Sequence, residues 1–191
     1  MTIFTVLCHP LPDSFNGRIA RVVQEVGAST GHTVLMHDLY KEKFNPVLSS
    51  GELLSRYSFD GQVQGYMDEV SDSDVLIFIH PDWWGQMPAV LKGFIDRIFR
   101  PGIAYDYSGD EFLEKELEPL LSDKKGVVFF TTDSEESAGK HPLIDIWQER
   151  IFQYCGIDGE CHVFYSARKS SFFQKKSYLQ TVKEKLLSIL L

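Results

Sequence analysis

The feature that most constrains the fold is a short run of uninterrupted apolar residues, VLIFI, at residues 75–79. Such a run, rich in branched and aromatic side chains, is typical of a strand that is buried on both faces of a parallel sheet. Pro81 ends this strand, because a proline cannot donate to a central ladder. A loop with two adjacent tryptophans follows, and then a helix with apolar residues at helical spacing over 90–99. The stretch 74–107 therefore predicts a strand, an aromatic loop and a helix as one unit.

The same alternation of strand and helix recurs along the chain, without an internal repeat or a linker. Strands are expected at residues 2–8, 32–39, 75–79, 125–131 and 161–166. Helices are expected at residues 15–25, 51–70 (interrupted at Gly61 and Gly65), 90–99, 142–154 and 172–190, with a helical turn or two at 113–121. Because such crossovers are right-handed, the pattern predicts one α/β domain, residues 1–191, built as a three-layer sandwich. We expect a five-stranded parallel sheet with the doubly wound order 2-1-3-4-5.

Composition argues against several classes of partner. Nineteen basic and 27 acidic residues give a net charge of −8, which disfavours nucleic acid or an anionic membrane as the main partner. No apolar run is long enough to span a bilayer, and residues 2–8 form a strand instead of a signal peptide. Cys8, Cys155 and Cys161 match no zinc spacing, which indicates reduced thiols in a cytoplasmic protein.

The expected strand order places a switch point between the first and third strands, where open α/β sheets bind their ligands. The loops at residues 9–16 and 80–85 should face this crevice together. The first loop has neither the GxGxxG nor the P-loop pattern, so a phosphate would bind at the helix N-terminus, near Ser14, Asn16 and a charged His9. The alternative is that Ser14 only caps the helix and His9 only ends the strand.

The aromatic residues of this region have two interpretations. Trp83 and Trp84 could form the wall of a pocket for a flat ring, or they could pack against the neighbouring helix or at a subunit interface. Tyr105 and Tyr107 could reach over the same cleft, or they could anchor a surface loop. Two large aromatic residues in a loop after a strand favour the pocket.

Imidazole and carboxylate groups also gather at the expected strand ends, at His9, His80, Asp82 and His141. They are the usual ligands of zinc, but their separations are long and no helical HxxxH pair exists. We therefore expect no metal site. A Ser–His–Asp triad is not expected either, because the chain has no GxSxG elbow.

Several short stretches, in this order, resemble the flavodoxin-like NAD(P)H:quinone oxidoreductases, the family of DT-diaphorase and its shorter bacterial relatives. The stretches are HP (9–10), SFN (14–16), DLY (38–40), FNP (44–46), the strand, tryptophan loop and "PAxLKGxxDRxF" helix of 74–99, and AYDY (104–107). Together they cover most of residues 1–107. The resemblance implies a flavodoxin-like fold.

The resemblance also implies a homodimeric flavoprotein with FAD or FMN, which takes a hydride from NADPH or NADH and passes two electrons to a quinone or a similar acceptor. Nicotinamide and quinone would use the same flavin face in turn. The residues that would hold the flavin are His9, Ser14, Phe15 and Asn16 at the phosphate, Pro81, Asp82, Trp83, Trp84 and Gly85 along the ring, and Thr131, Thr132, Asp133 and Ser134 at its far edge. The implied catalytic residues are Tyr105 and Tyr107, which would cap the acceptor pocket across the dimer interface, and His141, which would stabilise charge on the ring.

One turn departs from the family pattern. The family usually has Thr-Thr-Gly-Gly after the fourth strand, where this chain has TTDS at residues 131–134, and no tyrosine lies between this turn and His141. Asp133 would repel a negatively charged ring. Two alternatives therefore stay open, a regulatory or ancillary flavin-binding protein with little reductase activity, and a metal-dependent hydrolase on the same fold.

Overall fold

Five parallel strands form the centre of the computed structural model, which describes residues 1–55, 57–108, 115–136 and 139–191. The strands are β1 (Thr2–Leu7), β2 (Thr33–Asp38), β3 (Val75–Pro81), β6 (Lys125–Thr131) and β7 (Asp158–Phe164). Their order in the sheet is β2-β1-β3-β6-β7, so the expected order is confirmed. All the pairings within this sheet are parallel.

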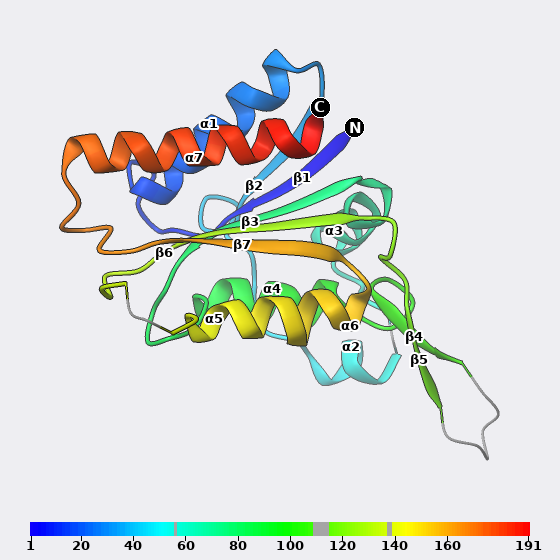
Figure 1. Cartoon of the computed structure of the whole chain (residues 1–191). Helices are drawn as coiled ribbons and strands as arrows, with labels where there is room; N and C mark the ends of the chain where they lie inside the picture. The colour runs from blue at the N-terminus through cyan, green and yellow to red at the C-terminus, as the bar shows by residue number, and fades with distance from the viewer. Residues whose placement is uncertain (56, 109–114, 137–138) are drawn as a thin grey trace.

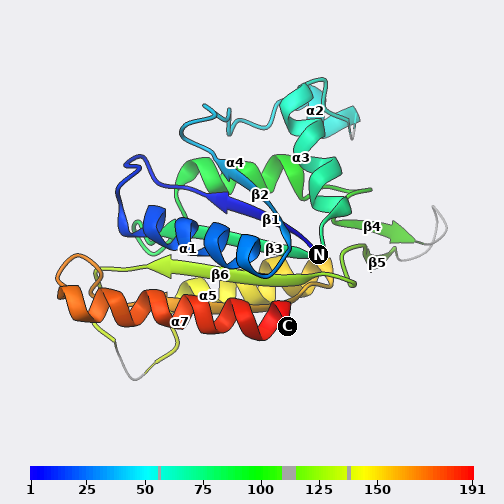
Figure 2. The ribbon, with the colours of Figure 1, turned by 90° about the horizontal axis from the view of Figure 1, so that it is seen from above.

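Helices cover both faces of the sheet, which makes three layers (Figure 1). On one face, α1 (Phe15–Ser29) and α7 (Phe172–Leu190) lie side by side (Figures 1 and 2). The other face is covered by α3 (Gly61–Asp72), α4 (Ala89–Ile98), and the continuous stretch of α5 (Pro142–Asp145), the π-helical segment η1 (Ile146–Phe152) and α6 (Gln153–Cys155).

A short helix, α2 (Ser50–Ser55), is attached to the outside of α4 by a buried ion pair. Arg97 Nη2 lies 2.6 Å from Glu52 Oε1, and the Arg100 guanidinium donates to the Glu52 carbonyl. Burial alone would raise the pKa of Glu52, but hydrogen bonds from Arg97 and Ser58 lower it to about 2. The carboxylate is therefore charged and paired at neutral pH.

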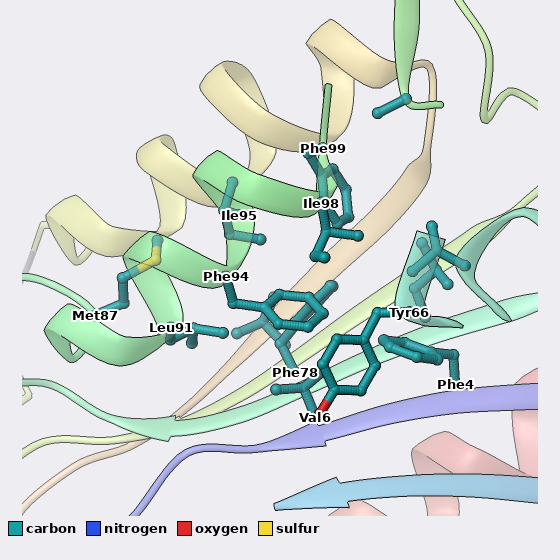
Figure 3. Packing of buried hydrophobic residues seen from close by; sticks show 14 of the residues in the cluster. Phe4, Val6, Tyr66, Phe78, Met87, Leu91, Phe94, Ile95, Ile98 and Phe99 are labelled. Atoms are coloured by element: carbon teal, nitrogen blue, oxygen red, sulfur yellow. The ribbon is translucent and has the colours of Figure 1, made fainter. Parts of the chain in front are cut away.

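The apolar run of β3 supplies both cores, because successive side chains point to opposite faces of the sheet. Val75, Ile77 and Ile79 face α1 and α7, whereas Leu76 and Phe78 face α4. Figure 3 shows Phe78 among the side chains of α4, with Phe4 and Val6 of β1 and Tyr66 of α3. Strand β3 is thus buried on both faces, as its central place in the sheet requires.

The structure differs from the sequence prediction at several element boundaries. Strand β7 begins at Asp158 instead of Cys161, α1 continues to Ser29, and Gly65 lies inside α3 without interrupting it. The predicted helical turn at 113–121 is wrong for its described part, because β4 (Tyr105–Ser108) and β5 (Glu116–Pro119) pair as an antiparallel hairpin. Residues 113 and 114 lie outside the described residues. A hydrogen-bonded partner strand outweighs the weak helical pattern of this segment.

The three cysteines are free, as expected. Burial raises the pKa of the Cys8, Cys155 and Cys161 thiols to about 12, so all three are neutral at pH 7 and poor nucleophiles. In the described part of the chain, no helix has both the length and the apolar character that crossing a bilayer requires.

Candidate functional site

A pocket of about 330 Å³ opens at the carboxyl ends of the central strands. Its lining residues are His9, Phe15, Asn16, Pro81, Asp82, Trp83, Thr131, Thr132, Asp133, Ala167, Arg168 and Lys175. The loops after β1 and β3 thus meet at the switch point, as the strand order predicts, and the turns after β6 and β7 complete the walls.

Asn16, in the first turn of α1, connects two of these walls. Its Nδ2 donates to Thr131 Oγ1 at 3.0 Å, and the Asp82 backbone N–H donates to the Thr131 carbonyl at 2.7 Å. The Asn16 side chain is only 2% exposed, yet its Oδ1 has no hydrogen-bond partner among the described residues. Because an unpaired buried acceptor costs about 1–3 kcal/mol, it indicates a donor from outside the protein.

The loop between β1 and α1 is held by its own hydrogen bonds. Ser14 caps α1 by accepting from the Gly17 N–H at 3.1 Å, and it does not line the pocket. His9 Nδ1 accepts from the Leu11 N–H at 3.0 Å, so the ring proton lies on Nε2. Burial lowers the pKa of His9. The expected positive charge on His9 is therefore wrong at neutral pH, and this side chain offers a neutral N–H donor.

The Asp82 side chain lines the pocket and also contacts His141, the residue that immediately precedes α5. His141 Nδ1 accepts from the Leu143 N–H at 3.3 Å, which puts the ring proton on Nε2, 3.2 Å from Asp82 Oδ2. Thr132 Oγ1 donates to the same carboxylate oxygen at 3.0 Å. Asp82 Oδ1 has no partner among the described residues, although it is buried. His141 itself lies behind Asp82 and does not line the pocket.

The tryptophan loop is a tight two-residue turn. Trp83 and Gln86 exchange backbone hydrogen bonds at 2.9 and 3.1 Å, and Trp84 and Gly85 between them have φ of 60° and 72°. Two positive φ values are typical of a type I′ turn, which suits glycine and strains a tryptophan. Trp83 lines the pocket beside His9, whereas Trp84 is fully exposed and lies outside the lining, with Gly85. The ring-binding role of Trp84 stays a prediction.

The turn after β6 contains the departure from the family pattern. Asp133 Oδ1 accepts from the Arg168 backbone N–H at 3.0 Å, and Oδ2 lies 3.3 Å from Arg168 Nε. This pairing counters the repulsion expected from Asp133 toward a negative ligand. Ser134 donates from its backbone to Thr132 Oγ1 and does not line the pocket.

Tyr105 and Tyr107 lie at the opposite end of the molecule from the pocket. The hairpin β4–β5 precedes β6 and projects beyond the amino end of the sheet (Figure 1). The Tyr107 hydroxyl lies 2.7 Å from the Tyr154 hydroxyl, and this hydrogen bond raises the pKa of Tyr154 to about 12. Within one chain the two tyrosines cannot cover the pocket, so their capping role depends on a second copy.

Three lining residues were missed by the sequence reasoning: Ala167, Arg168 and Lys175. They follow β7 and begin α7, at the carboxyl end of the fifth strand. The rule that ligands bind beyond the carboxyl ends of strands would have found them, since the segment 167–176 contains four basic residues in a chain that is acidic overall.

His80 is engaged by the protein on both ring nitrogens. The Trp147 indole N–H lies 3.0 Å from Nε2, and Nδ1 lies 2.8 Å from the Pro81 carbonyl. Burial lowers the pKa of His80 to about 4, so the ring is neutral at pH 7. It therefore cannot serve as a metal ligand in this arrangement. Among the described residues, no group of three histidine, cysteine or acidic side chains is placed to hold a metal ion.

Comparison with known proteins agrees with this geometry. Residues 1–188 match a protein family described as having a flavodoxin-like fold. The chain is 28% identical over 165 residues to an uncharacterized NAD(P)H oxidoreductase of Haemophilus influenzae, covering 83% of this chain and 80% of that one. It is 30% identical over 149 residues to the ribosyldihydronicotinamide dehydrogenase [quinone] of Rattus norvegicus, covering 68% of this chain and 62% of that one. The crystal structure of Smu.1420 from Streptococcus mutans superposes with a TM-score of 0.84 at 33% identity, over 97% of this chain and 98% of that one.

Proposed function

Because the chain belongs to the family of proteins with the flavodoxin-like fold, we infer that it is a flavin-dependent oxidoreductase. It takes a hydride from NADPH or NADH and passes two electrons to a quinone or a similar acceptor. The observation that carries this inference is the pocket at the switch point, where the loops after β1, β3 and β6 meet.

The residues present fit a flavin, which brings a phosphate, a hydroxylated chain and a ring with a polar edge. Two unpaired buried acceptors belong to pocket-lining residues, Asn16 Oδ1 and Asp82 Oδ1, and they match hydroxyl or N–H donors of such a ligand. The N-terminus of α1 favours an anion. A bound flavin supplies the redox chemistry, because its ring can accept a hydride and then release the electron pair.

The protein side chains supply binding and orientation. We propose that the backbone N–H groups of Phe15 and Asn16 hold the phosphate end with the His9 N–H, whereas Asn16 Oδ1 accepts from a flavin hydroxyl. Pro81, Asp82 and Trp83 would line the ring, with Thr131 to Asp133 at its far edge. His141 would act on the ligand through Asp82. Its Nε2–H points at the Asp82 carboxylate, which itself lines the pocket. Four residues of the expected flavin site lie outside the pocket lining: Ser14, Trp84, Gly85 and Ser134. They would contact the flavin only if their loops moved, and otherwise would act on it through the lining residues beside them.

We also propose a homodimer in the cytoplasm. The segment around α2 exposes five large apolar side chains, which we call the α2 patch: Val47, Leu53, Leu54, Tyr57 and Phe59. Exposed apolar side chains gathered on one segment are typical of a protein interface. A partner copy would bring Tyr105 and Tyr107 to a pocket that they cannot reach within one chain. The free, neutral cysteines suit a reducing compartment.

The proposal predicts that the purified protein is yellow and that stripped protein takes up flavin. Asn16→Ala should weaken flavin binding by about tenfold to hundredfold, because it removes buried hydrogen bonds worth about 1–3 kcal/mol. Asn45→Ala, outside the pocket, should leave flavin affinity unchanged. Titration of stripped protein with FMN and FAD, followed by flavin fluorescence, measures both variants.

Two outcomes would contradict the proposal. A protein that takes up neither FMN nor FAD is not a flavoenzyme. A protein that binds flavin but does not oxidise NADH or NADPH when a quinone is added is a flavin-binding protein with an ancillary or regulatory role. Flavin uptake together with quinone-dependent NAD(P)H oxidation is the expected result.

A further inference from the structure

The first turn of α7 exposes two adjacent phenylalanines. Phe172 and Phe173 are 73% and 81% exposed, and their ring centroids lie 5.9 Å apart. Neither ring lines the pocket, although α7 begins at the end of the molecule where the pocket opens (Figure 1). Large apolar side chains that contact each other at the surface indicate a place that binds something outside the chain.

Lysines flank these two rings along the chain. Lys169 precedes them and Lys176 lies one helical turn after them. Both lysines are exposed, and neither ammonium group forms an ion pair with a residue that the structure describes. Lys176 and Lys183 also line a groove between α1 and α7, together with the apolar side chains of Val22, Val26 and Leu179 and the carboxylate of Glu25. We give the name α7 tip to four residues: Lys169, Phe172, Phe173 and Lys176.

The uneven distribution of charge along the chain reconciles a basic surface with the net charge of −8. Residues 161–183 contain five lysines and arginines, and all 27 acidic residues lie outside this segment. Asp133 pairs with Arg168, so the free cations beside the two rings are lysines. At physiological ionic strength, exposed charges more than about 8 Å apart are largely screened from each other. The lysines of the α7 tip therefore attract anions although the chain as a whole is acidic.

Apolar rings beside free ammonium groups match the two parts of a lipid surface, its apolar interior and its anionic headgroups. We propose that the α7 tip docks on the surface of a membrane that contains anionic lipids. Phe172 and Phe173 insert among the headgroups, and the lysines contact lipid phosphates. Two protruding rings can enter a fluid lipid surface without a matching cavity, whereas a protein partner would have to supply one.

Docking through the α7 tip brings the pocket end of the sheet close to the lipid. Leu11, in the loop after β1, and Trp84, in the loop after β3, are also exposed at this end and add to its apolar surface. A quinone dissolved in the bilayer would then lie close to the pocket. This consequence for the electron acceptor rests on the proposed function, whereas the docking surface does not.

Sedimentation of the purified protein with lipid vesicles tests the docking. The protein should bind vesicles made of phosphatidylglycerol and phosphatidylcholine in equal parts, and it should not bind vesicles of phosphatidylcholine alone. Raising the salt concentration to about 1 M should weaken the binding at least about tenfold, because the Debye length falls to about 3 Å.

Substitutions in the α7 tip should reduce vesicle binding without affecting the fold, which thermal unfolding checks. Lys169→Ala combined with Lys176→Ala should weaken it about twentyfold, because each lysine near an anionic lipid surface contributes about fivefold. Phe172→Ser combined with Phe173→Ser should weaken it at least about tenfold, since two apolar side chains no longer leave water. Phe172→Leu combined with Phe173→Leu should retain binding. Lys125→Ala is the matched control and should change nothing, because Lys125 is an exposed lysine at the opposite end of the sheet.

A second measurement separates the docking from the proposed reaction. With NADH or NADPH as the donor and vesicles at limiting concentration, the lysine and serine variants should reduce a long-tailed quinone held in anionic vesicles at least about fivefold more slowly. They should reduce a water-soluble quinone at an unchanged rate. If vesicle binding holds and neither quinone is reduced, the proposed function fails and the docking surface stands. Quinone reduction without vesicle binding has the reverse meaning.

Three further results would overturn the docking surface. Equal binding to both kinds of vesicle shows that anionic lipid is not recognised. Binding that depends on the lysines but not on the phenylalanines shows that the rings do not insert. If vesicles do not bind but polyglutamate does, with the same dependence on the lysines and phenylalanines, the α7 tip is a surface for an acidic protein instead.

Discussion

His80 is a buried side chain that holds the end of strand β3 in place and does not line the candidate site. The sequence places it among possible metal ligands, next to Asp82. The structure places the ring against Trp147 and Phe130, with the Trp147 N–H donating to Nε2 and Nδ1 donating to the Pro81 carbonyl. A neutral ring satisfies both contacts, so the role of His80 is to fix the end of β3.

The lowered pKa of His80 makes stability depend on pH. Above pH 6.5 the folded and unfolded states both hold a neutral ring, whereas between pH 6.5 and about 4 only the unfolded state takes up a proton. The free energy of unfolding should therefore fall by about 3 kcal/mol as the pH is lowered through this range, because one proton bound only by the unfolded chain changes it by about 1.4 kcal/mol for each pH step of one.

His80→Gln tests this prediction, because glutamine offers Trp147 an acceptor but does not titrate. Urea unfolding of both proteins from pH 7.5 to pH 4 should give curves that converge as the pH falls, since only the unsubstituted protein loses this contribution. Curves that stay parallel would show that His80 does not titrate between the two states.

At the scale of elements, the "FNP" and "LKG" stretches of the family pattern are in direct contact in the structure. Gly93 lies in α4, and a Cβ at this position would lie 2.1 Å from the Pro46 carbonyl oxygen. The extended segment after β2 therefore packs directly on the helix backbone. Only glycine permits this approach, which fixes the path of the chain toward α2.

Gly93→Ala should destabilise the protein by about 1–3 kcal/mol, because the added methyl group overpacks this contact. Gly65→Ala in α3 is the matched control, since nothing lies within 4 Å of its Cβ position. It should raise the free energy of unfolding by up to about 1 kcal/mol through helix propensity alone. Denaturant unfolding measures both changes, and a stabilising Gly93→Ala would disprove the close packing.

At the scale of the whole molecule, the pocket and the hairpin β4–β5 lie at opposite ends of the sheet. The tyrosines of the hairpin therefore bear on the pocket only if two copies associate, and the α2 patch is an exposed apolar surface through which copies could associate. Leu54 and Phe59 are its most exposed members, at 85% and 89%.

Leu54→Asp combined with Phe59→Asp should raise the dissociation constant of the proposed dimer at least tenfold, because charges placed in an apolar interface lose their hydration. Sedimentation velocity across a concentration series measures this change. Phe173→Asp, at an equally exposed site on α7, should leave the association state unchanged. A protein that is monomeric at all concentrations would contradict the homodimer.

The sequence by itself determined the layers and the pocket loops after β1, β3 and β6, because the elements and their ends depend on local patterns. The strand order followed from the doubly wound arrangement that such an alternation of strands and helices favours. The apolar run of β3 and the helical spacing of apolar residues in α4 and α7 can be recognised without knowing what packs against these elements. Prolines and N-cap residues mark where the strands end and the helices begin, and the ends of parallel strands must meet at one edge.

Only the tertiary structure decided how single side chains are used, because their partners come from distant parts of the chain. The neutral state of His9, the outward position of Trp84 and the bond between Asp82 and His141 depend on burial and on φ values that no local pattern reports. The hairpin β4–β5 formed because a strand partner was available. Arg168 and Lys175 joined the pocket because β7 and α7 fold back beside β6 and α1, which brings residues from the end of the chain next to those near its start.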